Sequence, residues 1–437
     1  MSGHYDVAVI GAGAAGLAAG LTVQASGLSF VVLEARRRIG GRAFTDTTSF
    51  PGIPFDHGGH WLHAAARNPF TKIADRLGFR YKSDIDWSHR VLLLRGGGEA
   101  PQAMLDASAS AMAAANEKIT AAGHAARDAA FADVIDSADP WFPLTRQAFG
   151  QITSHELKAC SILDYASYVE EGGDFPVENG YGALVAAHAR GLPVRLDTPV
   201  TRIALNGRGV EIGTPRGTVK ARAAIMALPV NVLAQGLRFD PGLPPDMRDA
   251  IAYCPMGHAE KIALLLDRPL DGFGHVYGDI IDAPPMKVPP FNLHINPFGR
   301  PIVVSHLAGD EARDLERQGE AAMIQLAIER MVDAFGAHIR KRILKGVATH
   351  WSSARFTLGG YSHCKPGHAH VREAFRQPVG ERLFFAGEHC SEQFWSTIHG
   401  AHLSGISAAM RAIAQLERPR APPIPRAVAP CTDAVFP

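Results

Sequence analysis

The sequence has few cysteines, almost no net charge and no long apolar run. Its five cysteines are scattered and form neither a C-x-x-C motif nor a metal-type cluster, so we expect a reducing, cytoplasmic location and no metal site. Lys and Arg total 44 against 43 Asp and Glu, and a net charge of +1 gives no overall field to attract nucleic acid or an anionic membrane. No apolar stretch is long enough to span a bilayer, and a strand-like segment that begins at Tyr5 leaves no room for a signal peptide.

The remaining composition is typical of a soluble enzyme. Hydrophobic residues make up 46% of the chain and charged residues 20%, which is the balance of an ordinary globular protein. A length of 437 residues exceeds what one core usually holds, and predicts two domains or one large domain with insertions.

The N-terminal segment has the pattern of a β-α-β unit. Residues 5–10 are β-rich and end in a glycine turn, residues 14–25 are small and helical, and residues 30–33 form a second apolar strand. The turn has the sequence GAGAAG, in which glycines let the backbone approach a pyrophosphate at the N-terminus of the helix. Glu34 follows about 20 residues later, where an acid accepts hydrogen bonds from a ribose. The predicted cofactor contacts of this unit are Gly11, Gly13, Ala14, Ala15, Gly16 and Glu34.

The segment after this acid distinguishes FAD from NAD. The run LEARRRIGGR at residues 33–42 resembles the extended flavoprotein signature, in which a second glycine turn follows the acid. Gly41 allows another close approach of the backbone, and Arg42 is available to neutralise a phosphate. Ala35 and Arg36 complete the predicted contacts of this segment.

The rest of the chain alternates between two kinds of pattern. Residues 101–134 are Ala-rich and predict helix, while short strands are expected at 194–196, 200–205, 210–212 and 224–227. Residues 241–345 mix strands and helices, and a strand at 382–386 leads into a helix at 397–415. The predicted fold combines α/β and α+β parts: an FAD-binding Rossmann-like domain (βαβ, GxGxxG) with an inserted mixed substrate-binding domain. We assign residues 1–80, 176–240 and 346–417 to the first domain, 81–175 and 241–345 to the second, and 418–437 to a flexible Pro-rich tail.

Several further motifs follow one another along the chain. They are DHGGHWLH at 56–63, TPV at 198–200, MGHAEK at 256–261, GGY at 359–361, FFAGE at 384–388 and STIHGA at 396–401. Together with the N-terminal unit they resemble, from Tyr5 to about Leu416, the flavin-containing amine oxidase family, which includes monoamine oxidases, polyamine and spermine oxidases and histone lysine demethylases.

The resemblance implies roles for the first of these motifs. Gly58 and Gly59 permit close approach to the isoalloxazine ring, while His60, Trp61 and His63 line the substrate side. For each histidine alone, a hydrogen-bonded structural role is the alternative. The second motif implies that the backbone of Val200 meets the adenine.

Lys261 is expected to hold a water near flavin N5. Lys261 precedes the apolar run 262–266, and burial of its charge would cost free energy unless it has a partner. The alternative to this buried role is a lysine on an edge strand that points to solvent. The resemblance further implies that Trp351 flanks the ring and that Tyr361 forms one wall of an aromatic slot for the amine. Monoamine oxidases bind FAD through a cysteine where this chain has Gly360, so non-covalent FAD is expected.

The last two motifs resemble the C-terminal flavin signature. Gly387 and Glu388 are expected at the pyrophosphate and ribityl groups, and a helix that starts near Thr397 and Ile398 is expected to direct its N–H groups at flavin N1 and O2. Monoamine oxidases have a second tyrosine at the position of Thr397, so the second wall of the slot is expected from Phe394 or Trp395.

These features predict an FAD-dependent amine oxidase. Hydride passes from the α-carbon of a neutral amine to flavin N5, the imine is hydrolysed to an aldehyde or ketone and an amine, and O2 is reduced to H2O2. The predicted partners are O2 and a polyamine, secondary or primary amine, without nucleic acid or membrane, and the sequence leaves a homodimer open. Three alternatives are a desaturase or protoporphyrinogen-type oxidase that acts on C–C bonds, an L-amino acid oxidase, and a non-catalytic flavoprotein module. Lys261 with Tyr361 argues against the first, His60-Trp61 in place of an arginine against the second, and the lack of room for a coiled-coil insertion against the third.

Overall fold

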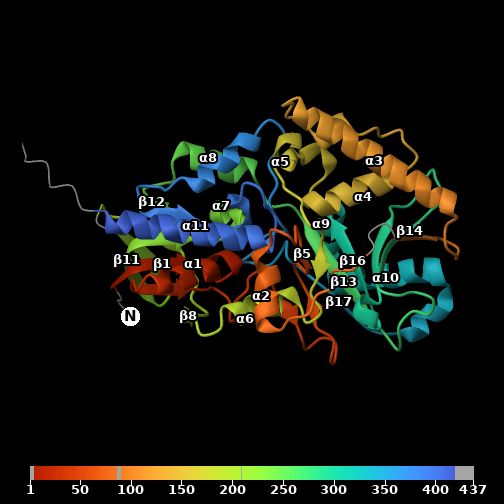
Figure 1. Cartoon of the computed structure of the whole chain (residues 1–437), viewed down its shortest axis with the longest axis horizontal. Helices are drawn as coiled ribbons and strands as arrows, with labels where there is room; N and C mark the ends of the chain where they lie inside the picture. Colours follow the sequence, from red (N-terminus) through yellow and green to blue (C-terminus); the bar gives the residue numbers. More distant parts are fainter. Residues whose placement is uncertain (1–3, 86–89, 208, 419–437) are drawn as a thin grey trace, which may run out of the picture.

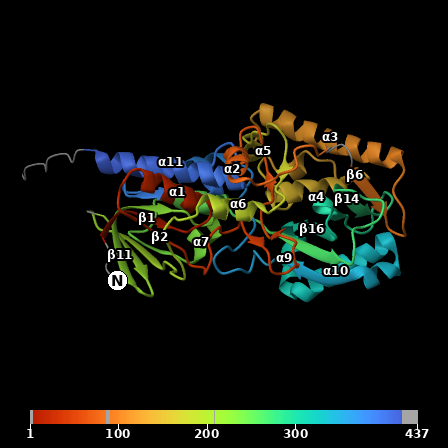
Figure 2. The same ribbon diagram turned by 60° about the horizontal axis from the view of Figure 1, so that its bottom comes forward.

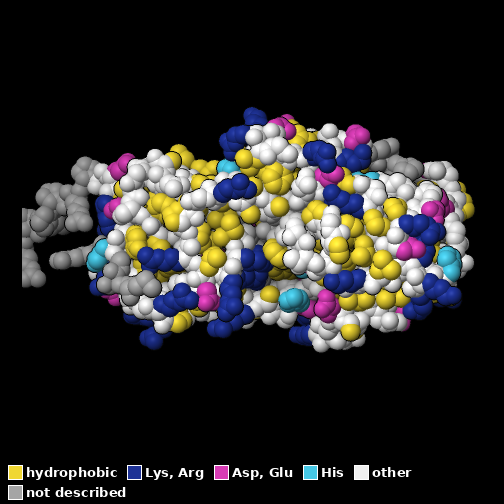
Figure 3. All heavy atoms as spheres, turned by 90° about the horizontal axis from the view of Figure 1, so that it is seen from below, with side chains coloured by type: hydrophobic (Ala, Val, Ile, Leu, Met, Phe, Trp, Pro, Cys, Tyr) yellow, Lys and Arg dark blue, Asp and Glu magenta, His cyan; other side chains and the backbone are white. Residues whose placement is uncertain are grey.

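The computed structural model describes residues 4–85, 90–207 and 209–418 and is elongated, with one β-sheet in each half (Figure 1). The N-terminal strand and the C-terminal helix lie in the same half. Among the described residues no helix is long and apolar enough to span a membrane. Basic, acidic and apolar side chains all appear across the face drawn in Figure 3, as expected for a nearly neutral chain.

The first sheet is built around the predicted β-α-β unit. Its central strands are parallel: β1 (His4–Ile10) lies between β2 (Phe30–Leu33) and β11 (Gly217–Met226), with β8 (Val194–Arg195) beyond β2 and β18 (Leu383–Phe385) also paired to β11. Residues 7–10 of β1 are buried, as expected for a strand covered on both faces. The strands β9 (Arg202–Leu205), β10 (Val210–Thr214) and β12 (Arg238–Asp240) extend the sheet beyond β11.

Helices cover both faces of this sheet. On one face α1 (Ala14–Ala25) packs against α11 (Ile398–Glu417), and Gly405 makes the close contact possible because a Cβ there would overlap the Ala15 carbonyl oxygen. On the other face α7 (Val230–Gln235) and α8 (Pro245–Tyr253) contribute to a second core. The two ends of the chain therefore share one core, which explains why cofactor motifs occur at both ends of the sequence.

The second sheet has the order β17-β13-β16-β15-β14-β6. Figure 2 shows it between two pairs of helices, α3 (Gln102–His124) and α4 (Phe142–Thr153) on one side and α9 (Gly309–Gln318) and α10 (Glu320–Phe335) on the other. Its strands are β6 (Arg90–Leu94), β13 (Ala259–Leu266), β14 (Val276–Ile281), β15 (Phe291–Ile295), β16 (Ile302–Ala308) and β17 (Ile343–Ala348).

Shorter elements complete the fold. They are the helices α2 (Pro69–Leu77), α5 (Ile162–Ala166) and α6 (Tyr181–His188), and the strand pairs β3 (Thr45–Asp46) with β4 (Phe55–Asp56) and β5 (Trp61–Leu62) with β7 (Phe175–Pro176). The pair β5–β7 joins the segment that contains His60 to the segment that follows the acidic residues at 170–174.

The structure corrects several predicted boundaries. The helix expected over 101–134 ends at His124, because Ala126 has φ 52° and the chain then forms a short 3-10 turn at 131–133. The strand expected at 200–205 begins at Arg202, the strand expected at 224–227 is the end of the longer β11, and the helix expected to begin at Thr397 begins at Ile398. The predicted Pro-rich tail lies, apart from Arg418, outside the described residues. We retain the two-domain division as a proposal, and the boundary expected after residue 345 falls within β17.

Candidate active site

A cavity of about 1440 Å³ is lined by residues from both halves of the molecule. Its lining includes the glycine turn after β1, the N-terminus of α11, and strands β13, β14 and β16 of the second sheet. Typical small-molecule pockets have roughly 300–1000 Å³. The volume therefore suits an extended cofactor together with a substrate.

The glycine turn presents bare backbone to this cavity. Gly11 has φ +99°, and a Cβ at Gly11 would overlap the Ala227 carbonyl oxygen. A Cβ at Gly13 would meet only Gly40 and Gly41, at 4.0 Å. Helix α1 has neither a side-chain cap nor an acid in its first turn, so its N–H groups remain available to an anion. Ala14 and Ala15 line the cavity beside the turn, and Gly16 packs against Gly11.

Glu34 lines the same end of the cavity. Its Oε2 accepts from the backbone N–H of Ala12 at 2.7 Å and its Oε1 from that of Arg36 at 2.8 Å. These bonds fix the carboxylate at the end of β2 and leave further lone pairs toward the cavity. Ala35, Arg36 and Val200 line the cavity next to it.

Arg42 was predicted to be available to a phosphate, but in the structure it is already paired with Glu388. Its Nη1 lies 3.0 Å from Oε1 of Glu388 and donates to the Gly360 carbonyl at 2.6 Å. Burial raises and the Arg42 charge lowers the pKa of Glu388, and the net direction is downward. Both side chains and Gly41 border the cavity, as does Gly387, so a phosphate would meet an Arg–Glu pair rather than a free arginine.

Lys261 occupies a central strand and is buried. The solvent-facing alternative is therefore wrong, because β13 is paired to β16 on one side and β17 on the other. Its Nζ donates to the carbonyl oxygens of Asp56 at 2.8 Å and Gly58 at 2.5 Å, and lies 2.9 Å from Nδ1 of His60. Burial lowers the pKa of Lys261 to about 7, against the opposing effect of the Asp56 carboxylate.

His60 and Trp61 lie between the two sheets. The His60 ring stacks on His306 with 5.2 Å between ring centroids, and its Nε2 is buried without a partner in the part of the chain that the structure describes. The Trp61 indole N–H donates to the Tyr277 hydroxyl at 2.9 Å. Both His60 and Trp61 line the cavity, as expected.

His63 lines the cavity beside an acid. Its Nδ1 lies 2.8 Å from Oδ1 of Asp174. Burial lowers and the Asp174 carboxylate raises the pKa of His63, and the net direction is upward.

The loop of Gly58 and Gly59 packs on the N-terminus of α11. A Cβ at Gly58 would overlap the Arg42 carbonyl oxygen, and a Cβ at Gly59 would come within 2.8 Å of Cδ1 of Ile398. The Thr397 hydroxyl caps α11 by accepting from the Gly400 N–H at 3.0 Å, and donates to the Phe394 carbonyl at 2.7 Å. Thr397 therefore places the helix N-terminus at the cavity wall, with its own hydroxyl fully used.

Aromatic side chains line the cavity from separate segments. The Trp351 indole donates to the His57 carbonyl at 3.0 Å, and the Tyr361 hydroxyl donates to the Gln151 carbonyl. Of the two residues expected for the second wall, Trp395 lines the cavity and Phe394 packs on His399 instead. Trp351 is held by Glu260, which accepts from its backbone N–H at 2.8 Å.

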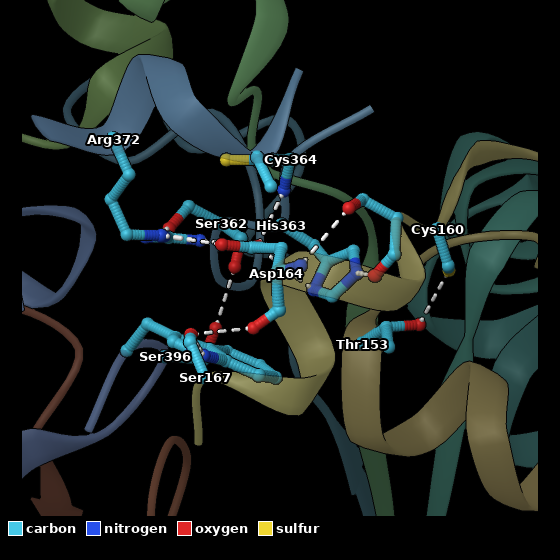
Figure 4. Close-up of polar contacts among 12 residues, drawn as sticks. Thr153, Cys160, Asp164, Ser167, Ser362, His363, Cys364, Arg372 and Ser396 are labelled. Carbon is cyan, nitrogen blue, oxygen red and sulfur yellow. Dashed lines mark hydrogen bonds and ion pairs between the residues drawn. The ribbon is translucent and has the colours of Figure 1, made fainter. Parts of the chain in front are cut away.

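A buried ion pair behind Tyr361 ties the two halves together. Asp164 of α5 accepts from Arg372 at 2.6 and 2.7 Å and from the Cys364 N–H at 2.8 Å (Figure 4). His363 lies on its other side, 3.3 Å from Asp164 Oδ2. The pair fixes the segment that immediately follows Tyr361.

A row of polar side chains on the second sheet was not predicted from the sequence. Asn292 of β15 lies 3.3 Å from His306 of β16 and 3.5 Å from Asp279 of β14, and His306 is paired in register with Lys261. Asp279 is buried and accepts from Gln147 at 2.6 Å and Arg90 at 2.7 Å. The available signal was a polar residue at every second position in the strand segments 277–279 and 292–294, and the polar pair Ser305-His306 within an otherwise apolar strand.

Comparison with known proteins shows the family of this chain. Residues 14–413 match the sequence model of the flavin containing amine oxidoreductase family. The chain belongs to this family. It is 29% identical to Polyamine oxidase 2 of Arabidopsis thaliana over 92% of this chain and 87% of the relative. It is 30% identical to Polyamine oxidase 3 of Oryza sativa subsp. japonica, with the same coverage.

Solved structures show the same fold. Wild-type putrescine oxidase bound to putrescine superposes with a TM-score of 0.76 and 19% identity, covering 95% of this oxidoreductase and all of that chain. The predicted fold class, the flavin cofactor and the class of enzyme are thereby confirmed. The bare glycine turn, the helix N-termini and the cavity volume fit FAD.

Proposed function

We propose that this flavin amine oxidoreductase oxidises polyamines, or another secondary or primary amine, with O2 as acceptor and H2O2 as product. FAD supplies the hydride acceptor when bound. The observation that carries the proposal is Lys261, a buried amine fixed by two carbonyl oxygens and His60 at the wall of a cavity that also contains the cofactor turn. The relatives named polyamine oxidases support the substrate class.

The residues for FAD and those for the amine form two overlapping groups, at a cofactor end and a substrate end of the cavity, and His60, Trp351 and Thr397 belong to both. Those that would hold FAD are Gly11, Gly13, Ala14, Ala15, Gly16, Glu34, Ala35, Arg36, Gly41, Arg42, Gly58, Gly59, His60, Trp61, Val200, Trp351, Gly387, Glu388, Thr397 and Ile398. Because Gly360 offers no thiol, the cofactor is held without a covalent bond. Those that would face the amine are Lys261, Tyr361, Trp351, His63, His60 and Thr397.

Asp279 is suited to a second cationic nitrogen. It lines the substrate end as a buried carboxylate, three strands from Lys261, or about 14 Å at the usual strand spacing. Its partner Arg90 is half-exposed and able to yield its place to a substrate ammonium. A substrate with two nitrogens at this separation is typical of a polyamine, whereas a monoamine has no second nitrogen to bind Asp279.

The reactive amine has to be neutral before it loses a hydride. Aromatic walls such as Tyr361 and Trp395 disfavour an ammonium by excluding water. Lys261 has a pKa of about 7 and is therefore able to exchange a proton near neutral pH.

An anaerobic flavin-bleaching assay tests the proposal. We expect polyamines to reduce the flavin faster than monoamines or amino acids, and air to restore the oxidised spectrum with one H2O2 per turnover. Asp279→Asn is expected to raise KM for polyamines more than for monoamines, with Asp282→Asn, an acid outside the cavity, as control. Reduction by a porphyrinogen or polyene and by no amine would overturn the proposal.

A cytoplasmic location also remains our proposal. The described cysteines, Cys160, Cys254, Cys364 and Cys390, are all free and buried, which suits a reducing compartment.

A further inference from the structure

A second, small cavity lies behind Lys261. It has a volume of about 60 Å³, enough for several water molecules, and Lys261 and His60 border both it and the large cavity. Its lining also includes His294 on one side and the partly exposed pair Arg300–Glu178 on another. Lys261 and His60 therefore form part of the wall between the substrate cavity and a route toward the surface.

The contacts of Lys261 suit either protonation state. As an ammonium, Nζ donates to Asp56, Gly58 and Nδ1 of His60. As a neutral amine, Nζ donates to the same two carbonyl oxygens and accepts a hydrogen bond from the Nδ1–H group of His60. A proton is thus able to move between Nζ and Nδ1 without rearrangement of any heavy atom.

Two further histidines continue from the small cavity. Nε2 of buried His294 lies 2.7 Å from Nε2 of His275, and His275 is partly exposed. Nε2 of His60 is buried without a partner among the described residues, and the small cavity borders both His60 and His294, so water in this cavity would link the two rings.

We propose that Lys261, His60 and the small cavity, with His294 and His275, form a proton exit path that leads away from the substrate cavity. The path deepens the proposed function and rests on it, because an ammonium substrate must lose a proton within the large cavity before it gives up a hydride. The entering substrate and the leaving proton then use different sides of Lys261.

The proton balance is closed at each step. The ammonium of Lys261 gives its proton to Nδ1 of His60 while Nε2 of His60 gives its proton to water in the small cavity, which leaves neutral Lys261 and a neutral imidazole. Neutral Lys261 then takes a proton from the substrate ammonium, which leaves a neutral amine. One proton has then left. The first tautomer of His60 is restored when its ring rotates so that Nδ1 meets the water and releases its proton there while Nε2 takes one up.

Several charged or titratable groups face this path. Asp56 and His306 adjoin Lys261, and His294, His306 and His63 act on His60. Variants that test the path therefore leave Asp56, His306 and His63 unchanged.

The kinetic test uses His294→Asn and His275→Asn, with His188→Asn as control because His188 borders neither cavity. At pH 7, where the amine enters as ammonium, we expect flavin reduction at saturating polyamine to slow at least tenfold in one or both variants. Added imidazole should restore the rate, KM should change less than twofold, and at pH 10 the variants should match the wild type. A rate within twofold of the wild type in both variants, or a loss that imidazole does not restore, would overturn the path.

A spectroscopic test needs no turnover. In oxidised holoenzyme labelled with ¹⁵N-histidine, with His60 assigned from His60→Gln, we expect Nδ1 of His60 to titrate together with Lys261 and this titration to vanish in Lys261→Met. Unchanged His60 resonances in Lys261→Met would contradict the path. If no amine reduces the wild-type flavin, the proposed function itself fails. The ¹⁵N spectrum does not depend on turnover, so the two failures can be told apart.

Discussion

Arg42 and Glu388 form an ion pair with 3.0 Å between Nη1 and Oε1, although they lie 346 positions apart in the sequence. Arg42 follows the N-terminal β-α-β unit and Glu388 precedes α11. Glu388 also accepts from the Ser362 hydroxyl at 2.6 Å. The pair therefore joins three cofactor-facing segments at one point of the cavity.

We expect Glu388→Gln to weaken FAD binding. The substitution keeps the shape of the side chain but leaves the Arg42 charge without its partner, at a cost of about 3 kcal/mol in a largely buried pair. The dissociation constant for FAD, measured by titration of the apoprotein, should rise at least tenfold. Glu392→Gln, on an exposed acid, is the control, and equal FAD affinity in both variants would contradict the assignment.

Lys261→Met should slow flavin reduction or reoxidation while FAD stays bound. Methionine fills a similar volume but exchanges no proton, and the carbonyl oxygens of Asp56 and Gly58 lose their donor. Stopped-flow absorbance under anaerobic and aerobic conditions separates the two half-reactions. Traces that match the wild type would show that Lys261 has no catalytic role.

The same variant should change the pH dependence of stability. Burial lowers the pKa of Lys261 from 10.5 to about 7, so between these values the unfolded chain binds a proton that the folded chain does not. The free energy of unfolding of the wild type, relative to Lys261→Met, should therefore rise with pH by about 1.4 kcal/mol per unit in this window. Denaturant unfolding of both holoproteins at pH 7.5 and 9 measures the difference, and a pH-independent difference would count against a neutral buried lysine.

Gly360→Cys is not expected to create a covalent flavin. A Cβ at Gly360 would lie 2.7 Å from Cβ of Ala259, so the new side chain displaces β13 or its own loop. We expect a loss of about 1–3 kcal/mol in stability and flavin that remains extractable with acid. Gly242→Ala, where a Cβ meets nothing within 4 Å, should leave stability nearly unchanged. Acid-stable flavin in the cysteine variant would refute this.

Asp164→Asn should destabilise the fold strongly. It leaves Arg372 buried without its counter-charge, which costs about 3–5 kcal/mol. Burial raises and Arg372 lowers the pKa of Asp164, to about 2 overall, so its contribution is present above pH 3.8 and is lost as pH falls through about 2. Thermal unfolding with Asp249→Asn, on an exposed position of α8, as control measures the effect, and equal Tm values would be inconsistent with a buried pair.

The cofactor end of the site was predictable because its signals are local. The glycine turn, α1 and Glu34 lie within one β-α-β unit, where strand, helix and turn preferences act over a few residues, and the predicted bounds of α1 and β2 match the structure. Lys261 was also recognisable, since a lysine in an apolar strand needs a partner.

Only the tertiary structure decided what surrounds these residues. Strand order and register place Asp279, Asn292, His306 and Lys261 on successive strands of the second sheet. The sequence of one strand does not show which strands will pair with it. The pairing of Arg42 with Glu388 likewise depends on how α1 and α11 pack. The sequence by itself thus determined the cofactor and singled out Lys261, while long-range packing decided which groups surround this lysine.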